Sequence, residues 1–311
     1  MDLADRAPAW TAAKPPVIED FIARGVHRFA ERVDAGAAAD LLADLKAERR
    51  YDESLFLSEA AFDADPQYRG VNPRPGRNLL DKFSGQLDFV EKAPHIVSAL
   101  SALFGPDYEL IDRKVVCGVP AKSIPDWLKA RILGNPVNNL GPYVQPQYRD
   151  VTYFFGIDFH QDLIDFKDRE ADFAPLYVYL HPVTRADAPL YLLEKSHSLG
   201  ASVFPHDLTR NDGGWRYRSA QGEVQAEQLI LTGEAGFAAV WHACTLHGTQ
   251  PDAADDERIS LRYLIGPKAG VRAGIHVVNG ALGVPLRLPS TRVDLDDKGA
   301  AQIKANTVNK A

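Results

Sequence analysis

The sequence predicts a mainly β protein with flanking helices, built as a sandwich or barrel and not as a parallel α/β sheet. Apolar residues at helical spacing dominate the N-terminal third. Short runs rich in β-branched and aromatic residues follow from about residue 108, and Gly, Pro and Asp turns separate them. Many short strands without alternating helices are typical of sandwiches and barrels.

The N-terminal segments are predicted from spacing and from helix-breaking residues. Residues 1–16 are rich in Ala and Pro, which favours an extended lead-in, and Gly105-Pro106 is a typical helix stop. We predict two helices within 17–50 interrupted at 34–36, a loop over 63–76 that covers a site, and a helix over 86–104.

The strand-like segments are predicted at 108–111, 114–119, 151–159, 176–180, 190–193, 228–231, 235–241, 260–265 and 275–278. We expect one domain over residues 17–290, with its helices within 17–107 and a C-terminal tail at 291–311.

Composition excludes several classes of protein. The 311 residues carry a net charge of −7, which argues against a nucleic-acid partner. Two cysteines are too few for a disulfide framework or a structural zinc site. We expect no signal peptide and no membrane span, a cytoplasmic location and a small-molecule substrate, while the oligomeric state stays open.

The central motif is His160-Gln161-Asp162, followed later in the chain by His247 and Arg258. Alternate residues of a strand share a face, so His160 and Asp162 can point together. Two imidazoles and one carboxylate can occupy one face of a divalent metal and leave the opposite positions open, as in non-haem Fe(II) oxygenases. A bidentate guanidinium matches a carboxylate, so Arg258 implies a carboxylate co-substrate.

These residues belong to a longer pattern. It consists of His160-Gln161-Asp162, Ala188-Pro189-Leu190, Lys195-Ser196-His197, His247-Gly248-Thr249 and Arg258. The pattern resembles the phytanoyl-CoA dioxygenase family of Fe(II)/2-oxoglutarate oxygenases from roughly Ala93 to Pro267. That family shows H-x-D, a small-residue G-x-L segment leading to P-G-S-H, and a distal H-G-S/T with an arginine about eleven residues on. This chain departs from it at Glu194-Lys195, where Pro-Gly is usual, and at residues 233–236, where Gly-Asp is usual.

The resemblance implies a double-stranded β-helix, a jelly-roll barrel of the cupin type, buttressed by the N-terminal helices. It also implies that His160, Asp162 and His247 bind Fe(II), with 2-oxoglutarate and O2 as co-substrates. Arg258 and Ser260 share a strand face and are predicted to hold the distal carboxylate of 2-oxoglutarate, with Thr249 and Gln161 as auxiliary contacts.

Several neighbouring residues compete for these roles. Asp158 is as far from His160 as Asp162 is, and His242 precedes His247; the order of the family motif favours Asp162 and His247. Arg262 shares the face of Arg258, and we interpret it as a surface or salt-bridged arginine. Either Lys114 or Lys122 is a candidate second contact to the co-substrate, and the sequence does not choose between them.

A probable substrate-loop insertion spans residues 121–149, just before the metal-binding strand. Its aromatic residues Trp127, Tyr143 and Tyr148 are predicted to contact substrate. The sequence as a whole indicates a 2-oxoglutarate-dependent dioxygenase that hydroxylates or otherwise oxidises a C–H bond of a small metabolite. The alternatives are a metal-dependent isomerase or hydrolase that does not use O2 and a non-catalytic binding protein on the same barrel.

Overall fold

A computed structural model of the chain describes residues 13–68, 72–74, 76–166 and 169–288. The predicted lead-in lies mostly, and the predicted C-terminal tail wholly, outside these residues. The helices are α1 (Pro16–Ala23), α2 (Ala35–Glu48), α3 (Glu59–Ala64), α4 (Asp88–Glu91), α5 (Pro94–Phe104), α6 (Asp126–Ile132) and α7 (Gly274–Leu282). Short 3-10 turns include η3 (Leu79–Gln86), η7 (Asp162–Asp165) and η8 (Ser196–Leu199).

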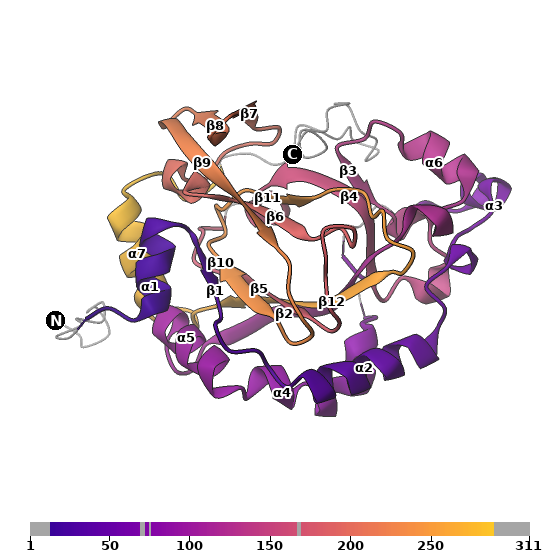
Figure 1. Cartoon of the computed structure of the whole chain (residues 1–311), viewed down its shortest axis with the longest axis horizontal. Helices are drawn as coiled ribbons and strands as arrows, with labels where there is room; N and C mark the ends of the chain where they lie inside the picture. The colour runs from indigo at the N-terminus through magenta and orange to yellow at the C-terminus, as the bar shows by residue number, and fades with distance from the viewer. Residues whose placement is uncertain (1–12, 69–71, 75, 167–168, 289–311) are drawn as a thin grey trace.

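The strands form one continuous curved sheet (Figure 1). They are β1 (Val26–Arg28), β2 (Glu109–Gly118), β3 (Val137–Asn139), β4 (Thr152–His160), β5 (Ala174–Tyr179), β6 (Leu190–Glu194), β7 (Asp207–Asn211), β8 (Gly214–Ser219), β9 (Gly222–Leu231), β10 (Ala238–Trp241), β11 (His247–Thr249) and β12 (Arg258–Gly266). Their order is β1-β10-β5-β12-β2-β4-β11-β6-β9-β8-β7, and β3 pairs with β4 off this path.

The parallel pairing of β2 with β4 joins two antiparallel halves of this sheet. One half is β1-β10-β5-β12-β2 and the other is β4-β11-β6-β9. The chain alternates between them from β4 to β6 and again from β9 to β12, and the hairpin β7–β8 lies between these two passages. Such alternation is the topology of a double-stranded β-helix, so the predicted fold class is confirmed. The sheet is not closed into a complete barrel, because its last strands, β8 and β7, form an outlying hairpin.

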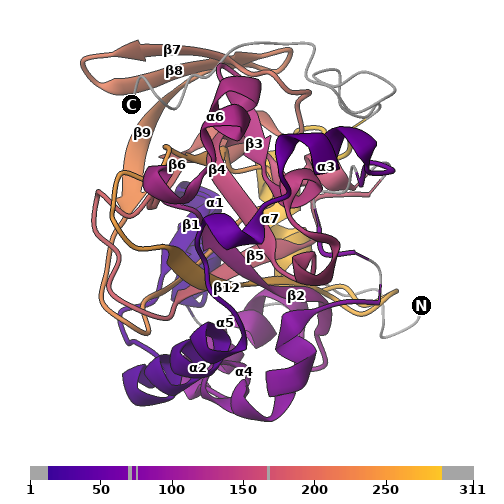
Figure 2. The ribbon, with the colours of Figure 1, turned by 90° about the vertical axis from the view of Figure 1, so that its right-hand side faces the viewer.

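Helices α2, α4 and α5 cover the outer face of the first half, whereas α3 and α6 lie beside β3 and β4 (Figure 2). Apolar side chains of α1, α2 and α5 enter the same core as strand residues such as Leu261 on β12 and Val115 on β2. Asp34 caps α2 by accepting hydrogen bonds from the backbone N–H groups of Gly36 and Ala37 at 2.8 and 3.1 Å. The helical layer therefore anchors one sheet and leaves its inner face for a site.

Strand β12 shows how one sequence supplies both faces. Ile259 and Leu261 pack into the core under the helices, whereas Arg258 and Arg262 line an internal pocket. All four are buried, so the alternation between the two faces of the strand appears in the type of residue and not in its exposure.

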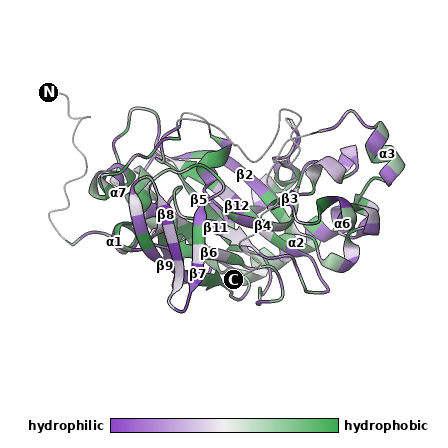
Figure 3. Ribbon diagram, turned by 90° about the horizontal axis from the view of Figure 1, so that it is seen from above, coloured by the Kyte–Doolittle hydropathy of each residue, from purple (hydrophilic) through white to green (hydrophobic). Residues whose placement is uncertain are grey.

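Most predicted elements are present, and two predictions need correction. Residues 275–278 form part of helix α7 and not a strand. Ile275 and Val278 are three residues apart and are both buried on one face of this helix. A short apolar run does not by itself distinguish a helix from a strand. The hairpin β7–β8 was not predicted. Hydrophilic and buried aromatic residues alternate along β8 (Figure 3), with Trp215 and Tyr217 facing inward.

Further segments differ in extent from the prediction. The helix predicted over 86–104 is divided into α4 and α5. Helix α3 occupies the beginning of the stretch predicted as a loop at 63–76, of which 69–71 and 75 lie outside the described residues. The two segments predicted at 108–111 and 114–119 form the single strand β2. Within the described part of the chain, no helix is long and apolar enough to cross a membrane.

Candidate active site

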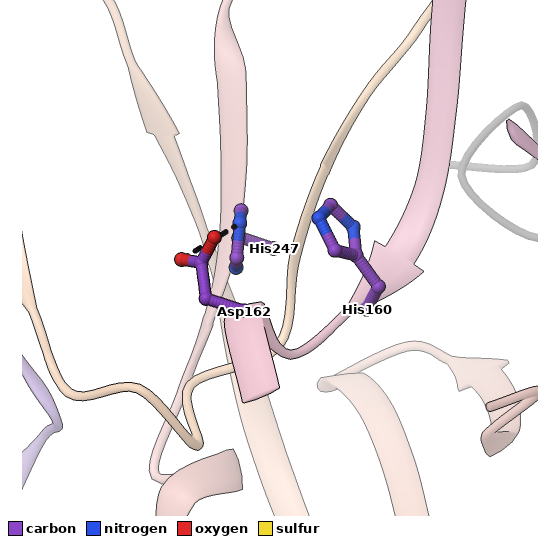
Figure 4. A group of neighbouring side chains, drawn as sticks. All are labelled: His160, Asp162 and His247. Carbon is purple, nitrogen blue, oxygen red and sulfur yellow. Dashed lines mark ion pairs between the residues drawn. The ribbon is translucent and has the colours of Figure 1, made fainter. Parts of the chain in front are cut away.

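Three side chains with metal-ligand chemistry meet between the two halves of the fold (Figure 4). His160 ends β4, Asp162 begins η7 and His247 begins β11. One ligand atom from each lies within 4.8 Å of the others, close enough for a single ion to bridge them. The structure therefore brings together the three residues that the motif predicts, and Asp158 is not among them.

The backbone fixes the orientation of both imidazoles. Nδ1 of His160 lies 2.9 Å from the carbonyl oxygen of Asp158, and Nδ1 of His247 lies 3.1 Å from that of Thr245. A carbonyl only accepts, so each Nδ1 carries the proton and each Nε2 keeps a free lone pair. Burial, followed by the neighbouring His160, lowers the pKa of His247 to about 4, which keeps that ring neutral near pH 7.

The carboxylate of Asp162 is buried but charged. Burial alone raises the pKa of this group, yet the positive Arg262 and then the adjacent imidazoles outweigh it and lower the pKa to about 2. Nη2 of Arg262 donates a hydrogen bond of 2.6 Å to Oδ1 of Asp162. Oδ2 has no hydrogen-bond partner among the described residues and lies 3.5 Å from Nε2 of His247.

The close approach of two strands explains why a glycine, Gly248, follows the distal histidine. A Cβ atom there would lie 2.6 Å from the backbone oxygen of Ile157 on β4, a clash with a rigid group. The strand pairing also shifts register between His247 and Thr249. Glycine thus lets β11 lie close enough to β4 for His247 to face His160.

Arg258 is a buried cation in the same pocket. Its side chain is fully buried, with the guanidinium carbon 5.0 Å from the ring centre of Phe154. Nη1 donates a 2.8 Å hydrogen bond to Oγ of Ser260, whereas Nε and Nη2 have no partner in the described structure. A buried charge with two unused donors is costly unless a ligand completes it. The arrangement therefore suits a carboxylate.

The pocket that contains these groups has a volume of about 100 Å³. Thr249 lines it with a buried hydroxyl that lacks a hydrogen-bond partner among the described residues. Its remaining lining includes apolar residues and several polar ones: Val116, Val137, Ile157, Ile164, Leu190, Asn72, Asn139, Thr152, Asp165 and Tyr177.

The structure separates the two candidate lysines. Lys114 lies on β2, is buried and lines the pocket, where its ammonium group contacts the side-chain oxygen of Asn72. Burial, followed by the nearby Arg262, lowers the pKa of Lys114 to about 7. Lys122 is exposed and lies 3.7 Å from Asp255, outside the pocket.

Gln161 does not line the pocket, contrary to the predicted auxiliary contact. Its amide nitrogen donates to the carbonyl oxygens of Gly200 and Cys244 at 2.8 and 2.9 Å, and its oxygen accepts from the backbone N–H of Ser202 at 2.9 Å. The side chain of a residue between His160 and Asp162 points away from theirs, so Gln161 ties three loops together instead.

The predicted aromatic substrate contacts also lie outside the pocket. Trp127 and Tyr143 pack against Phe62 of α3, with ring centres 5.8 and 4.8 Å from it. Tyr148 lies beneath the guanidinium of Arg49, at 5.2 Å. These rings attach the segment 121–149 to the N-terminal helices, and the segment reaches the pocket through β3 instead.

His242 and Arg262 have roles that the sequence left open. His242 bonds to Asn279 of α7 through Nε2 at 2.8 Å and accepts from the backbone N–H of Cys244, so it lies outside the candidate metal centre. Arg262 is salt-bridged, as predicted, but buried against Asp162. In the sequence, strand alternation places Arg262 on the same face as Arg258. This alternation is the signal that could have located Arg262 in the pocket.

No protein-family model matches the sequence, and no curated protein matches it significantly. Among solved structures, the chain is similar to the epimerase SnoN in complex with Fe3+, alpha ketoglutarate and nogalamycin RO, with 16% identity, a TM-score of 0.51, and 92% of this chain and 94% of that chain covered. It is also similar to the non-heme monooxygenase ThoJ, with 16% identity, a TM-score of 0.48, and 89% and 90% covered. At this identity, the likeness to SnoN shows the fold.

Proposed function

We propose that this protein is an Fe(II)/2-oxoglutarate-dependent dioxygenase that oxidises a C–H bond of a small-molecule metabolite. The observation that carries the proposal is a pairing within one pocket. A set of two histidines and one aspartate lies beside a buried arginine with two unused donors. A metal-dependent isomerase or hydrolase needs the first group but has no use for the second.

The residues present fit both the ion and the co-substrate. Nε2 of His160, Nε2 of His247 and Oδ2 of Asp162 would hold Fe(II), because these atoms converge and the other atom of each group is already bonded. Arg258 would bind the distal carboxylate of 2-oxoglutarate, supported by Ser260, and the unpaired hydroxyl of Thr249 would add a hydrogen bond.

Bound iron together with 2-oxoglutarate and O2 would supply the oxidising power, and the co-substrate would leave as succinate and CO2. The protein's own contribution is placement. Phe154 covers the Arg258 guanidinium, which excludes water from the carboxylate site and strengthens the ion pair. The buried imidazole of His247 stays neutral and Asp162 stays charged, as metal ligation requires.

We further propose that the substrate enters along β3 and the residues beside Asp162. Val137 and Asn139 of β3 and Ile164 of η7 line the pocket, so a partly apolar molecule with hydrogen-bonding groups fits this wall. The motif pattern favours the phytanoyl-CoA dioxygenase family as the branch. The structural neighbour SnoN is an epimerase, and the fold alone does not specify a reaction.

The proposal is tested with purified protein, Fe(II), 2-oxoglutarate and O2. We expect succinate to form even without the primary substrate, at a slow rate that depends on added iron and stops in the absence of O2. His160→Ala, Asp162→Ala and His247→Ala are each expected to abolish this turnover and the binding of Ni(II), a redox-inert replacement for iron, measured by calorimetry.

His242→Ala is the matched control, because it removes a buried imidazole that does not face the three ligands. Circular dichroism checks that each variant is folded. Iron-dependent activity that survives His247→Ala but not His242→Ala overturns the ligand assignment. Metal binding without any consumption of 2-oxoglutarate or O2 favours an isomerase or hydrolase, and the absence of metal binding favours a binding protein.

A further inference from the structure

Lys114 is a buried cation that the proposed reaction does not use. The residue is 4% exposed and lines the pocket of the candidate metal centre. Among the described residues, its ammonium group hydrogen-bonds only to the side-chain oxygen of Asn72, and no carboxylate forms a salt bridge with it. An ammonium group has three donors. Two of them therefore have no partner in the part of the chain that the structure describes.

The charge of Lys114 also lacks a close counter-charge. Burial, followed by the positive Arg262, lowers the pKa of Lys114 to about 7. The more distant attraction of three carboxylates does not offset this effect, and they belong to Asp112, Asp165 and Asp162. A buried cation whose partner is a neutral amide costs free energy unless a ligand supplies the opposite charge. Lys114 therefore suits an anionic ligand.

The pairing of β2 with β12 sets the place of Lys114 in the pocket. Gly118 lies opposite Arg258, and Lys114 lies opposite Arg262. Four residues of a strand span about 13 Å, so Lys114 and Arg258 approach the pocket from opposite ends. Arg262 bonds to Asp162, so the lysine end is the one beside the candidate metal ligands. A co-substrate anchored by Arg258 extends toward these ligands from the other end and leaves Lys114 for a second molecule.

We propose that Lys114 binds a carboxylate of the primary substrate, so that the protein oxidises a small carboxylic acid. This inference rests on the proposed function and adds a substrate class to it. Ile164 and Asp165, beside which the substrate is proposed to enter, line the same pocket as Lys114. One ammonium group among several carboxylates balances a single negative charge, whereas a phosphate group carries about two at pH 7. The site therefore favours a carboxylate over a phosphate.

The test compares acids with amides of the same shape. The probes are linear and aromatic monocarboxylates from acetate to indole-3-acetate, each paired with its primary amide. Calorimetry measures their binding to the protein loaded with Ni(II), a redox-inert replacement for iron, and 2-oxoglutarate, so that Arg258 is already occupied. Because only the acids can form an ion pair with Lys114, we expect the acids that fit to bind about ten- to a hundredfold more tightly than their amides.

Substitution of the lysine assigns this preference to one side chain. Lys114→Met removes the charge and keeps a long unbranched side chain, so it is expected to bind acids and amides equally. Lys114→Arg keeps the charge and is expected to retain part of the preference. Lys122→Met is the matched control, because Lys122 is an exposed lysine outside the pocket, 3.7 Å from Asp255, and it is expected to match wild type.

A second titration separates the substrate from the co-substrate. Under anaerobic conditions, the Fe(II) chelate of 2-oxoglutarate has a visible absorption band, so its titration measures co-substrate affinity. We expect Lys114→Met to keep the 2-oxoglutarate affinity of wild type. Arg258→Met is expected to do the reverse, since it loses 2-oxoglutarate affinity but still prefers acids over amides when Ni(II) is bound.

A wild-type protein without any preference for acids over amides overturns the proposal, and so does a preference that survives in Lys114→Met. Weaker 2-oxoglutarate binding by Lys114→Met also overturns it, because the lysine then contacts the co-substrate. If Lys114→Met does not fold, Lys114→Gln, which removes the charge with a smaller change in polarity, carries the same comparison. A wild-type protein that prefers acids but does not bind 2-oxoglutarate overturns the proposed function and leaves the carboxylate site in place.

Discussion

His160 and His247 are directly opposed residues on neighbouring antiparallel strands, β4 and β11. Their ring centres lie 4.3 Å apart, although the two residues are far apart in the sequence. Opposed residues of an antiparallel pair project to the same face of the sheet. The strand pairing alone therefore brings two imidazoles together, and Asp162 needs only the turn after β4 to join them.

The first prediction concerns the cost of keeping Arg258 ready for a ligand. Two of its donors are buried without partners, so the folded protein carries a desolvation cost that the ligand relieves. We expect Arg258→Met to leave the free energy of unfolding unchanged or to raise it, while 2-oxoglutarate affinity falls by roughly ten- to a thousandfold. Urea unfolding and the anaerobic chelate titration measure the two quantities.

Ser260→Ala is a milder variant at the same site, since it removes one hydrogen-bond partner of Arg258 and leaves the charge of the arginine. Its loss of 2-oxoglutarate affinity is expected to be smaller. A large loss of stability in Arg258→Met, with affinity preserved, contradicts the co-substrate role and assigns the arginine to the core.

Trp127 gives a second prediction, which replaces the role expected from the sequence. The ring packs against Phe62 and Tyr143 and lies under the guanidinium of Arg131, at 5.5 Å. We expect Trp127→Ala to lower the free energy of unfolding by about 2 kcal/mol, because a half-buried aromatic contact is lost. Coupled and uncoupled turnover are expected to change together.

Asn139→Ala is the contrasting variant, since Asn139 lines the pocket on β3. It is expected to alter substrate oxidation more than the slow decay of 2-oxoglutarate. If Trp127→Ala alone uncouples the two activities, the aromatic cluster contacts substrate after all.

The sequence predicted that His160, Asp162 and His247 meet and that Arg258 faces the same space, because these placements depend on local order and on strand alternation. His160 and Asp162 lie within one short motif, and His247 is marked by the glycine that follows it, Gly248. The side chain of Gln161 points away from the pocket for the same reason, since a residue between two that share a face points the other way.

The substrate side of the pocket could not be predicted in the same way. Asn72, Val137 and Asn139 reach it only through contacts between distant segments, which spacing does not encode. The bond of Arg262 to Asp162 depends on β12 and β4 lying in facing halves of the fold, so alternation could place the arginine on a face but not name its partner.

A third prediction follows from two buried histidines, His197 and His242, that lie outside the candidate ligand set. Burial lowers the pKa of His197 to about 3 and that of His242 to about 4. In the unfolded chain their pKa is about 6.5, so the unfolded state binds more protons as the pH falls below this value. Stability is therefore fully present above about pH 6.5 and is lost as the pH falls toward 4.

Each such histidine contributes a slope of up to about 1.4 kcal/mol per pH unit in this window. Urea unfolding between pH 7 and pH 5 measures the slope. His242→Gln is expected to reduce the slope by up to about 1.4 kcal/mol per pH unit, which corresponds to one proton. This change in slope is expected whatever the effect of the substitution at a single pH. A variant slope equal to that of wild type shows that His242 is protonated in the folded state and contradicts the assignment.

The last prediction concerns Lys195, which stands where the family that the sequence motif resembles usually has glycine. Its φ is +69°, in the left-handed region that costs an L-residue roughly 1–2 kcal/mol. Its ammonium group lies 3.7 Å from the exposed Glu227, and such a surface pair contributes little. Because glycine relieves the backbone cost but loses more entropy on folding, we expect Lys195→Gly to raise the free energy of unfolding by about 0.5–1 kcal/mol. Lys195→Ala is the matched control, since it removes the same side chain but keeps the Cβ atom, and it is expected to give no gain. The same gain from both variants in urea unfolding means that the side chain, and not the backbone conformation, limits stability at this turn.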